Sequence, residues 1–420
     1  MKLQGSVLLP GDKSISHRAI MLSSISLGTA RIENMLLSED TLATIDIFRK
    51  LGVEIIMDQN CMIVHGKGFE GLKNPKEVLD CQNSGTTARL LLGLLLGIQW
   101  HPPLQLTGDD SLKNRPMLRV VKYLRNLNGK IELRNDQYLP ATIYDSQMIN
   151  GTIKLDVASA QVKSAVILAA LKNSHITKIK ELQITRNHTE LMLKYLGCDI
   201  NTNDLEIHVS GKNPLMAKDI KVPGDISSAA FFIVAALIVP KSKITLLNCG
   251  VNPTRTGIFK VLDQIGAHYT LNNKRFFGYE PVSDLVIEYT KYLKPFRIEG
   301  DIMPELVDEI PILALLATQI EGVSTITGAK ELRVKETDRL MATSLELSKL
   351  GAQITELEDG LIIKGKTKLI PHEVNSYSDH RISMMLKVAR LLTPGFTILN
   401  DECDKISYPQ FTNDLKHLAN

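Results

Sequence analysis

Ten basic side chains stand where polar loops of the chain meet apolar segments. The free N–H groups and the dipole of a helix N-terminus already favour an anion, and Lys or Arg at the same place strengthens the attraction for phosphate or carboxylate. One such residue is usually a solvated cation, but ten at comparable junctions predict sites for small anions. They are Lys13, Arg18, Arg89, Arg115, Lys163, Arg186, Lys335, Arg339, Arg381 and Lys405.

Acidic residues are interspersed with these cations at Glu336 and Asp338, which alternate with Lys335 and Arg339. Such charges are either functional groups or salt bridges between residues four apart on a helix. The two look alike in a sequence, so both interpretations stay open.

Asp308 and Asp379 are further acids in the same part of the chain. Asp308 and Glu309 precede an apolar segment, where a carboxylate could be a plain N-cap. His380, between Asp379 and Arg381, could likewise be a structural capping residue.

The string Gly11-Asp12-Lys13-Ser14 is not a P-loop, because that motif needs Gly and Lys adjacent and a second glycine five positions earlier. No Gly-x-Gly-x-x-Gly follows a predicted strand, and the histidines form no His-Glu-x-x-His cluster. We therefore expect no nucleotide cofactor and no metal.

Six polar loops that run directly into apolar, helix-like segments position these residues. Their anchor residues recur at intervals of roughly 70 to 80 residues. The six segments begin at Gly11, Cys81, Ala158, Pro223, Leu306 and Ser376, and their anchors are Ser14, Ser84, Ser159, Ser227, Asp308 and Asp379.

Five amphipathic segments form a second series, with apolar residues at i, i+3, i+4 and i+7. Each ends at a glycine before a β-branched run, which predicts a helix stopped by a left-handed glycine and followed by a strand. The glycines are Gly52, Gly129, Gly197, Gly266 and Gly351.

The chain is thus predicted to consist of six α/β units of about 70 residues. An open solenoid used as a binding scaffold is the alternative, but the units are longer than ordinary solenoid repeats and their first helices are apolar nearly all round. We expect the units to close three by three into two globular domains. The seams are predicted near Pro10-Gly11 and Pro223-Gly224.

Composition excludes several classes of protein. The 420 residues carry 49 Lys and Arg against 46 Asp and Glu, a net charge of +3, which argues against a general nucleic-acid binder. The longest apolar run, Ala229 to Val239, is too short for a membrane span. Five scattered cysteines without a Cys-x-x-Cys pair predict reduced thiols in a cytoplasmic protein.

Six strings together resemble the 5-enolpyruvylshikimate-3-phosphate (EPSP) synthase family, in order from about Leu9 to Phe411. Two of them are highly specific: Lys13-Ser-Ile-Ser-His-Arg18 and Arg333-Val-Lys-Glu-Thr-Asp-Arg339. The others are Asn83-Ser-Gly-Thr-Thr-Ala-Arg89, Arg115-Pro116, Ser159-Ala-Gln161 and Asp379-His-Arg381.

The resemblance implies the enolpyruvyl transferase fold, an α/β fold of two inside-out, barrel-like domains with three βαβαββ repeats each. Residues 12–223 would form the domain that binds shikimate 3-phosphate. Residues 224–420 would form the other, completed by an N-terminal strand within 1–11, with the active site in the interdomain cleft.

The implied reaction transfers the enolpyruvyl group of phosphoenolpyruvate to the 5-hydroxyl of shikimate 3-phosphate and releases phosphate, a step of the shikimate pathway. Addition and elimination through a tetrahedral intermediate need paired acids that switch roles. The resemblance also implies no cofactor, no nucleic-acid or membrane partner, and a monomer in the cytoplasm.

The family's functional residues map onto this sequence one by one. Ser14, Arg18, Ser159, Ala160, Gln161, Arg186, Asp308 and Lys335 resemble its shikimate 3-phosphate contacts, to which Lys13 also belongs. Lys13, Gly85, Arg115, Gln161, Arg339, Arg381 and Lys405 resemble its phosphoenolpyruvate site. Asp308 and Glu336 are similar to its proton-transfer acids, with Asp308 assigned as the base at the hydroxyl, Glu336 as the acid at the methylene, and Lys13 and His380 as assisting groups.

Three positions depart from the family pattern: Gln82 replaces a common glycine, Leu90 replaces a proline, and Ala160 stands within Ser-Ala-Gln rather than Ser-Ser-Gln. The inhibitor glyphosate competes for the phosphoenolpyruvate pocket beside Gly85, so the first two changes leave its potency open. Gly85 itself favours sensitivity.

Two rival functions remain. UDP-N-acetylglucosamine enolpyruvyl transferase shares the fold and the donor but should have Lys-Asn near the start and a reactive loop cysteine, whereas this chain has Lys13-Ser14, and Cys81 precedes a helix. A catalytically dead phosphate-sugar binder should have lost Lys13, Asp308 or Glu336, and all three are present.

Overall fold

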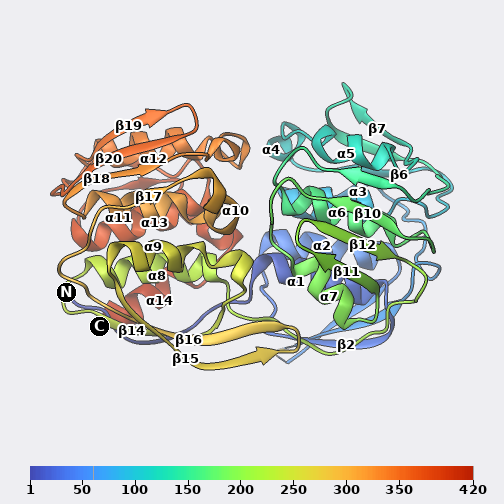
Figure 1. The fold of residues 1–420 in the computed structure, drawn as a ribbon, viewed down its shortest axis with the longest axis horizontal. Helices are drawn as coiled ribbons and strands as arrows, with labels where there is room; N and C mark the ends of the chain where they lie inside the picture. The colour runs from blue at the N-terminus through green and yellow to red at the C-terminus, as the bar shows by residue number, and fades with distance from the viewer. Residues whose placement is uncertain (60, 420) are drawn as a thin grey trace. The chain divides into compact units, whose positions relative to one another are not determined.

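The computed structural model describes residues 1–59 and 61–419. All six apolar segments form helices, as predicted, and every residue of the fourth and fifth is buried. These first-series helices are α1 (Lys13–Ser24), α3 (Gly85–Leu94), α6 (Ala160–Ala170), α8 (Ile226–Ile238), α11 (Ile310–Thr318) and α13 (His380–Leu392) (Figure 1).

The helix caps differ from the predicted anchors at three positions. Ser84, Ser159 and Asp379 are N-cap residues, but α1 and α8 are capped by Asp12 and Asp225, whose carboxylates accept backbone N–H bonds. Ser14 and Ser227 therefore lie inside their helices. Asp308 lies in a 3₁₀ turn, η3 (Val307–Glu309), ahead of α11, so its carboxylate is not the cap of that helix.

Second-series helices follow at the predicted places. They are α2 (Glu39–Lys50), α5 (Leu118–Arg125), α7 (His188–Tyr195), α9 (Gly257–Ile265) and α12 (Arg339–Lys349). Four of the five stop at a left-handed glycine, with φ of 86° at Gly52, 94° at Gly197, 74° at Gly266 and 93° at Gly351.

The prediction for Gly129 was wrong. Asn128 takes the left-handed conformation instead, with φ of 67°, and its side-chain amide donates to the carbonyl of Gln147 at 2.8 Å. Asn tolerates this region because its short polar side chain can bond locally. Gly129 is needed for space, since a Cβ there would lie 2.8 Å from the carbonyl oxygen of Leu124.

Within residues 1–59 and 61–419, five four-stranded sheets share one topology, in which a short first strand runs parallel to the second and two further strands run antiparallel. The sheet orders are β13-β2-β4-β3, β5-β6-β8-β7, β9-β10-β12-β11, β1-β14-β16-β15 and β17-β18-β20-β19. The sixth unit is shorter among the described residues, with a parallel pair, β21 (Val374–Asn375) and β22 (Ile398–Leu399).

The strands of the first three sheets are β2 (Leu27–Glu33), β3 (Glu54–Asp58), β4 (Cys61–Lys67), β5 (Leu79–Asp80), β6 (Leu104–Thr107), β7 (Ile131–Arg134), β8 (Tyr138–Ile143), β9 (Thr152–Lys154), β10 (Thr177–Lys180), β11 (Asp199–Asn203), β12 (Glu206–Ser210) and β13 (Ile220–Lys221). Those of the other two are β1 (Gln4–Leu8), β14 (Lys243–Gly250), β15 (His268–Phe277), β16 (Glu280–Glu288), β17 (Arg297–Ile298), β18 (Gly322–Ile326), β19 (Gln353–Leu357) and β20 (Gly360–Gly365). Short helices complete the chain: α4 (Asp110–Lys113), η1 (Pro253–Arg255), η2 (Gly300–Ile302), α10 (Met303–Leu306), η4 (Lys330–Val334), η5 (Asp401–Ile406) and α14 (Phe411–Ala419).

The chain divides into two compact units. Unit 2 comprises Gly11–Val222 with Phe277–Glu280, and unit 1 comprises Met1–Pro10, Pro223–Phe276 and Pro281–Asn420. Two short strands join sheets far away in sequence: β1 pairs with β14, and β13 pairs with β2.

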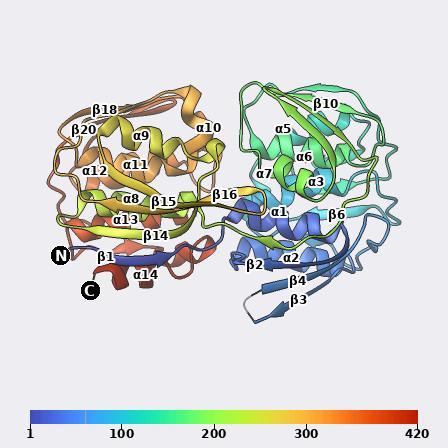
Figure 2. The ribbon, with the colours of Figure 1, turned by 60° about the horizontal axis from the view of Figure 1, so that its bottom comes forward.

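Three first-series helices pack together inside each unit, with the sheets outside them (Figures 1 and 2). In unit 2, α3 packs so closely on α6 that a Cβ at Gly93 would lie 2.0 Å from the carbonyl oxygen of Ala165. Only glycine permits this approach. No helix of the described chain is both long and apolar enough to cross a membrane.

A buried chain of hydrogen bonds links α1, α2 and α3. His17 Nδ1 lies 2.8 Å from Thr44 Oγ1, Thr44 lies 2.7 Å from Thr87 Oγ1, and Thr87 donates to Ser84 Oγ at 2.7 Å. Burial, reinforced by the positive charges of Lys13 and Arg18, holds the pKa of His17 well below its usual value.

The lowered pKa of His17 predicts a loss of stability in acid. Below about pH 6.5 the unfolded chain binds a proton that the folded chain does not, so stability falls as the pH falls. The substitution His17→Asn keeps an amide for Thr44 but removes the titrating group. Between pH 7 and 5, the free energy of unfolding of the wild type should fall by up to about 1.4 kcal/mol per pH unit more than that of the variant. Urea denaturation at several pH values measures the free energy of unfolding of both proteins. If it changes with pH equally in the wild type and the variant, His17 is not the group responsible.

Candidate functional site

The first two turns of α1 in unit 2 carry Lys13, Ser14 and Arg18. Asp12 caps this helix by accepting the N–H of Ile15 at 2.8 Å. The ammonium of Lys13 lies 3.1 Å from Asp40 Oδ2. Both Lys13 and Ser14 are partly exposed, so a cation and a hydroxyl are available to a ligand at a helix N-terminus.

Arg18 is buried and held by three oxygens. Its guanidinium donates to Thr189 Oγ1 at 2.6 Å, to Ser164 Oγ at 2.8 Å and to the carbonyl of Ser14 at 2.9 Å. Ser164 and Thr189 lie 2.7 Å apart and belong to α6 and α7. Hydroxyls of two further helices thus fix the orientation of an arginine whose charge is not neutralised by these partners.

Two guanidinium groups converge on Gly85, the first residue of α3. A Cβ built there would lie 2.9 Å from Arg89 Nη1 and 3.5 Å from Arg115 Nη1. Arg115 is oriented by Asn83, whose side-chain oxygen accepts its Nη2 at 2.5 Å. Gly85 therefore leaves room beside two cations at a helix N-terminus, an arrangement suited to a phosphate or carboxylate.

Gln161 belongs to the same group, since its Oε1 accepts from Arg89 Nη1 at 2.8 Å and its Nε2 donates to Thr86 at 3.0 Å. Ser159 and Ala160 form the N-terminus of the helix that carries Gln161, and the Ser159 side chain makes no capping bond. Arg89 was noticed in the sequence as one of ten cations, and the structure places it beside Gly85.

The prediction that Lys163 belongs to an anion site was wrong. Its ammonium is 1% exposed and lies 2.7 Å from Glu190 Oε1 and 3.2 Å from Glu181 Oε2. It also donates to the carbonyl of Thr185 at 3.1 Å. Lys163 is therefore a buried structural cation that holds the segment immediately before Arg186.

In unit 1, Arg339 binds three carboxylates. Its Nε donates to Asp379 at 2.8 Å, its Nη2 to Glu336 at 2.6 Å and its Nη1 to Asp308 at 3.3 Å. Burial acts to lower the pKa of Arg339, but the three negative charges outweigh it and raise that pKa above the ordinary value. Asp379 is fully buried, whereas Asp308 and Glu336 remain partly exposed and can meet a ligand.

Glu336 precedes α12 in an irregular stretch and pairs with Arg339 three residues later, so this is a salt bridge, but not one between residues four apart on a helix. Asp338 is the structural acid: it caps α12 by accepting the N–H of Met341 at 3.0 Å and pairs with Arg333 at 2.8 Å. Lys335 approaches Asp308 at 4.0 Å and Glu331 at 3.4 Å.

The start of α13 contributes His380 and Arg381, both buried. Asp379 caps this helix through the N–H of Arg381 at 2.8 Å, and Arg381 Nη1 donates to the carbonyl of Ser227 at 2.9 Å. Lys405 lies on η5, which packs on α13, and its largely exposed ammonium pairs with Glu402 at 2.8 Å. The structure thus gathers Asp308, Lys335, Glu336 and Arg339 with the N-terminus of α13.

Several residues that hold these groups were missed in the sequence: Ser164, Thr189, Glu181 and Glu190 are buried polar residues that bond to predicted site residues or to their neighbours. Ser227 was identified there only as an anchor and Glu309 only as a possible N-cap, and both are buried as well. Their partners are far away in sequence, so no local pattern reveals them. Buried serine on an otherwise apolar helix, as at Ser164 and Ser227, is the one available signal.

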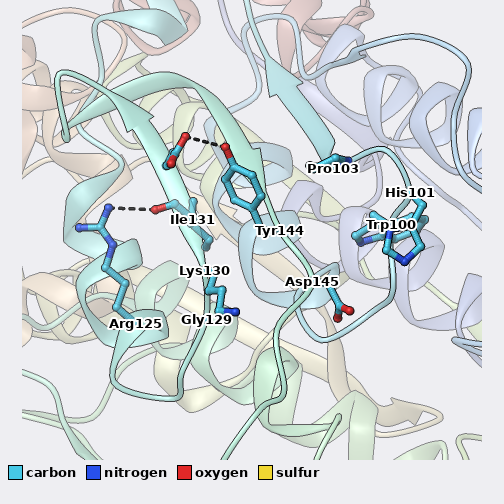
Figure 3. A pocket seen from close by; sticks show the side chains of 10 residues that line it. Trp100, His101, Pro103, Arg125, Gly129, Lys130, Ile131, Tyr144 and Asp145 are labelled. Carbon is cyan, nitrogen blue, oxygen red and sulfur yellow. Dashed lines mark hydrogen bonds between the residues drawn. The ribbon is translucent and has the colours of Figure 1, made fainter.

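A pocket of about 700 Å³ lies in unit 2 beside β7 and β8, and it contains none of the predicted site residues (Figure 3). Two hydrogen bonds lie within its lining: Arg125 donates to the carbonyl of Ile131 at 2.9 Å, and Tyr144 donates to Glu132 at 2.7 Å.

Cys81 does not fit the role of a reactive cysteine. The side chain is fully buried, and burial together with the charge of Asp80 raises the pKa of its thiol far above neutrality. A thiolate is the reactive form, so this burial disfavours a reactive role for Cys81.

Known proteins resemble the chain over nearly its whole length. The family model of EPSP synthase (3-phosphoshikimate 1-carboxyvinyltransferase) matches residues 1–415. A 3-phosphoshikimate 1-carboxyvinyltransferase of Bacillus cytotoxicus is 47% identical over 418 residues, which are 99% of this chain and 98% of the relative. One of Geobacillus thermodenitrificans is 48% identical over 420 residues, 99% and 96% of the two chains.

Solved structures agree with the family match. The EPSP synthase of Acinetobacter baumannii superposes with a TM-score of 0.88 at 39% identity, covering 99% of this chain and 96% of the other. The enolpyruvyl transferase NikO of Streptomyces tendae, at 17% identity and a TM-score of 0.80, covers 100% and 95% and shares the fold. The fold is thus the enolpyruvyl transferase fold, and the chain belongs to the EPSP synthase family, the 3-phosphoshikimate 1-carboxyvinyltransferases.

Proposed function

We propose that this protein transfers the enolpyruvyl group of phosphoenolpyruvate to the 5-hydroxyl of shikimate 3-phosphate and that Asp308 and Glu336 carry the proton transfers. The observation that supports these roles best is the guanidinium of Arg339, which binds both carboxylates, at 3.3 and 2.6 Å. One fixed cation thereby keeps two partly exposed acids near each other. Such a pair suits a reaction that needs two proton transfers.

The proposed reaction joins two anionic substrates, whose mutual repulsion must be offset by cations. In unit 2 we assign shikimate 3-phosphate to Lys13, Ser14, Arg18, Ser159, Ala160, Gln161 and Arg186, and phosphoenolpyruvate to Lys13, Gly85, Arg115 and Gln161. In unit 1 we assign Asp308 and Lys335 to the former substrate and Arg339, Arg381 and Lys405 to the latter. The convergence of Arg89 and Arg115 on Gly85 supports an anion there.

In the addition step, Asp308 takes the proton of the 5-hydroxyl while the hydroxyl oxygen bonds to C2 of phosphoenolpyruvate. Glu336 gives a proton to C3. In the elimination step, C3 returns a proton to Glu336, Asp308 gives its proton to the departing phosphate, and the C2–O bond to phosphate breaks as the C2–C3 double bond forms again. Each carboxylate therefore acts once as acid and once as base. Lys13 and His380 assist by offsetting charge near the reacting atoms.

The proposal extends to the two-domain division, 12–223 and 224–420 with the strand from 1–11, and to a monomeric enzyme of the cytoplasm. The compact units support the division, with boundaries at Gly11 and Pro223. The five scattered cysteines without a Cys-x-x-Cys pair support the compartment.

A phosphate-release assay tests the activity. We expect release from phosphoenolpyruvate only when shikimate 3-phosphate is added, and none with UDP-N-acetylglucosamine. The reverse pattern would establish the rival transferase, and no release with either acceptor would leave a binding protein. The buried Cys81 favours the first outcome.

Gly85→Ala should weaken phosphoenolpyruvate binding. Its methyl group would lie 2.9 Å from Arg89 Nη1, so the guanidinium must move away from the anion it faces. We expect the KM for phosphoenolpyruvate to rise by about tenfold or more, as for one misplaced methyl group in a pocket, and the KM for shikimate 3-phosphate to change less. Gly151→Ala is the matched control, because a Cβ there meets nothing within 4 Å. Equal KM values for both variants would argue against an anion at Gly85.

A further inference from the structure

Ser227, on the buried helix α8 of unit 1, bonds on both sides through one hydroxyl. It accepts from Arg255 Nη2 at 2.6 Å and donates to Glu309 Oε1. An arginine can only donate and an ionised carboxylate can only accept, so the direction of both bonds is determined. All three side chains are at most 3% exposed, which excludes water as a ready substitute.

Glu309 directly follows Asp308, the proposed base, in the sequence. Asp308 and Glu309 belong to the three-residue 3₁₀ turn η3, so a bond that holds Glu309 also limits where Asp308 can lie. Asp308 itself accepts from Arg339 Nη1 at 3.3 Å. The turn is thus held from the α8 side by Ser227 and from the α12 side by Arg339.

Ser227 makes a second, separate contact through its backbone. Its carbonyl oxygen accepts from Arg381 Nη1 at 2.9 Å, and this bond does not depend on the hydroxyl. Replacing the side chain therefore removes the link to Glu309 and leaves the link to Arg381. A side-chain substitution at Ser227 therefore tests the position of Asp308 through Glu309, without removing the contact to Arg381, a proposed anion-binding residue.

We infer that Ser227 and Glu309 are positioning residues that set the location of Asp308 for proton transfer. The inference rests on the proposed function, in which Asp308 takes the proton of the acceptor hydroxyl. A displacement of about 1 Å from the productive geometry can lower a rate by about 10²-fold. No direct contact of Ser227 or Glu309 with a substrate is needed for this role.

Ser227→Ala and Ser228→Ala form a matched pair for the test. Ser228 is the next residue of α8 and is equally buried, but its hydroxyl has no hydrogen-bond partner among the described residues. We expect Ser227→Ala to lower kcat by about 10- to 100-fold, with the KM for phosphoenolpyruvate within about threefold of the wild type. Ser228→Ala should keep the wild-type kcat and both KM values.

Glu309→Met provides an independent measurement should Ser227→Ala fold poorly. Methionine has a similar length but cannot accept the bond, and it removes a buried charge instead of leaving it unpaired. We expect a similar fall in kcat. Because both substitutions break one link, the double variant Ser227→Ala with Glu309→Met should be no slower than the slower single variant, whereas Ser228→Ala should add nothing to Glu309→Met.

Melting temperatures and initial rates at saturating substrates distinguish the outcomes. Folded Ser227→Ala and Glu309→Met proteins with wild-type kcat would overturn the inference, as would losses that multiply in the double variant. A rise in KM with unchanged kcat would also overturn it. If the wild type and Ser228→Ala fail to release phosphate with shikimate 3-phosphate, the proposed function itself is wrong; if they succeed and Ser227→Ala equals them, only the positioning role is wrong.

Discussion

Glu336→Gln should lower kcat by about 10²- to 10⁴-fold, the range that general acid–base catalysis contributes. Glutamine has nearly the same volume, and its side-chain oxygen can still accept the hydrogen bond that Arg339 Nη2 donates to Glu336 at 2.6 Å. The loss of rate would therefore come from the missing acidic proton and not from a rearranged site. Asp308→Asn should cause a loss in the same range. Glu321→Gln, an exposed acid of the same unit, should leave kcat unchanged.

Heavy water separates the roles of the two acids. Protonation at C3 makes a transient methyl group, so deuterium from solvent should appear in the methylene group of the product. Glu336→Gln should suppress this incorporation as strongly as it suppresses turnover, measured by mass spectrometry of product and recovered phosphoenolpyruvate. If Glu336→Gln retains the full rate, or if only Asp308→Asn blocks incorporation, the assignment of Glu336 as the acid at the methylene is wrong.

Lys163→Met should destabilise the protein by about 3–5 kcal/mol, because it leaves two buried carboxylates without their cation. Lys163 lies 2.7 Å from Glu190 and 3.2 Å from Glu181, and all three side chains are nearly fully buried. Urea or thermal denaturation measures the loss. Lys154→Met is the control, since that side chain is exposed on β9.

The pH dependence of the Lys163→Met variant provides an internal check. In the wild type, burial already raises the pKa of Glu181, opposed by Lys163 and assisted by the charge of Glu190. Without the lysine, which acts to lower it, the pKa of Glu181 should rise further in the folded state, so that state binds more protons than the unfolded chain and gains stability as the pH falls.

The deficit of Lys163→Met should therefore shrink between pH 7 and 5, and adding Glu181→Gln with Glu190→Gln should remove most of it. If Lys163→Met is no less stable than Lys154→Met at pH 7, the ion pairs of Lys163 with Glu181 and Glu190 contribute little to the stability of the fold.

Local patterns in the sequence predicted the helices well. The apolar runs of α8 and α11 are buried on every side, and an all-apolar helix has no other stable location in a globular protein. The left-handed glycines that end four of the amphipathic helices were also predictable, because the pattern of a helix followed by glycine is local. They are Gly52, Gly197, Gly266 and Gly351. At Gly129 two local solutions compete, and Asn128 supplies the left-handed residue instead.

Burial of charge could not be predicted in the same way. Lys163 and the site cations occupy similar junctions in the sequence, but Lys163 meets Glu181 and Glu190 only after α6, β10 and α7 have packed. Ser227 and Glu309 are likewise brought together from separate helices. Such contacts depend on tertiary packing, so they have no periodic signature, and sequence reasoning could not tell an anion-binding cation from a buried ion pair.

The pairing of β1 with β14 has a consequence for the order of events during synthesis. Residues 4–8 leave the ribosome long before their parallel partner, which begins at Lys243, more than half the chain later. At about 5–20 residues per second, the strand would wait on the order of 10–50 s before a partner exists. Unit 2, apart from a four-residue tip at 277–280, is by contrast one continuous stretch of chain. The protein is therefore built with its β1 strand reserved for the unit made last, and a rearranged chain that starts at Gly11 and carries residues 1–10 between Val222 and Pro223 would bring the strand close to its partner in time.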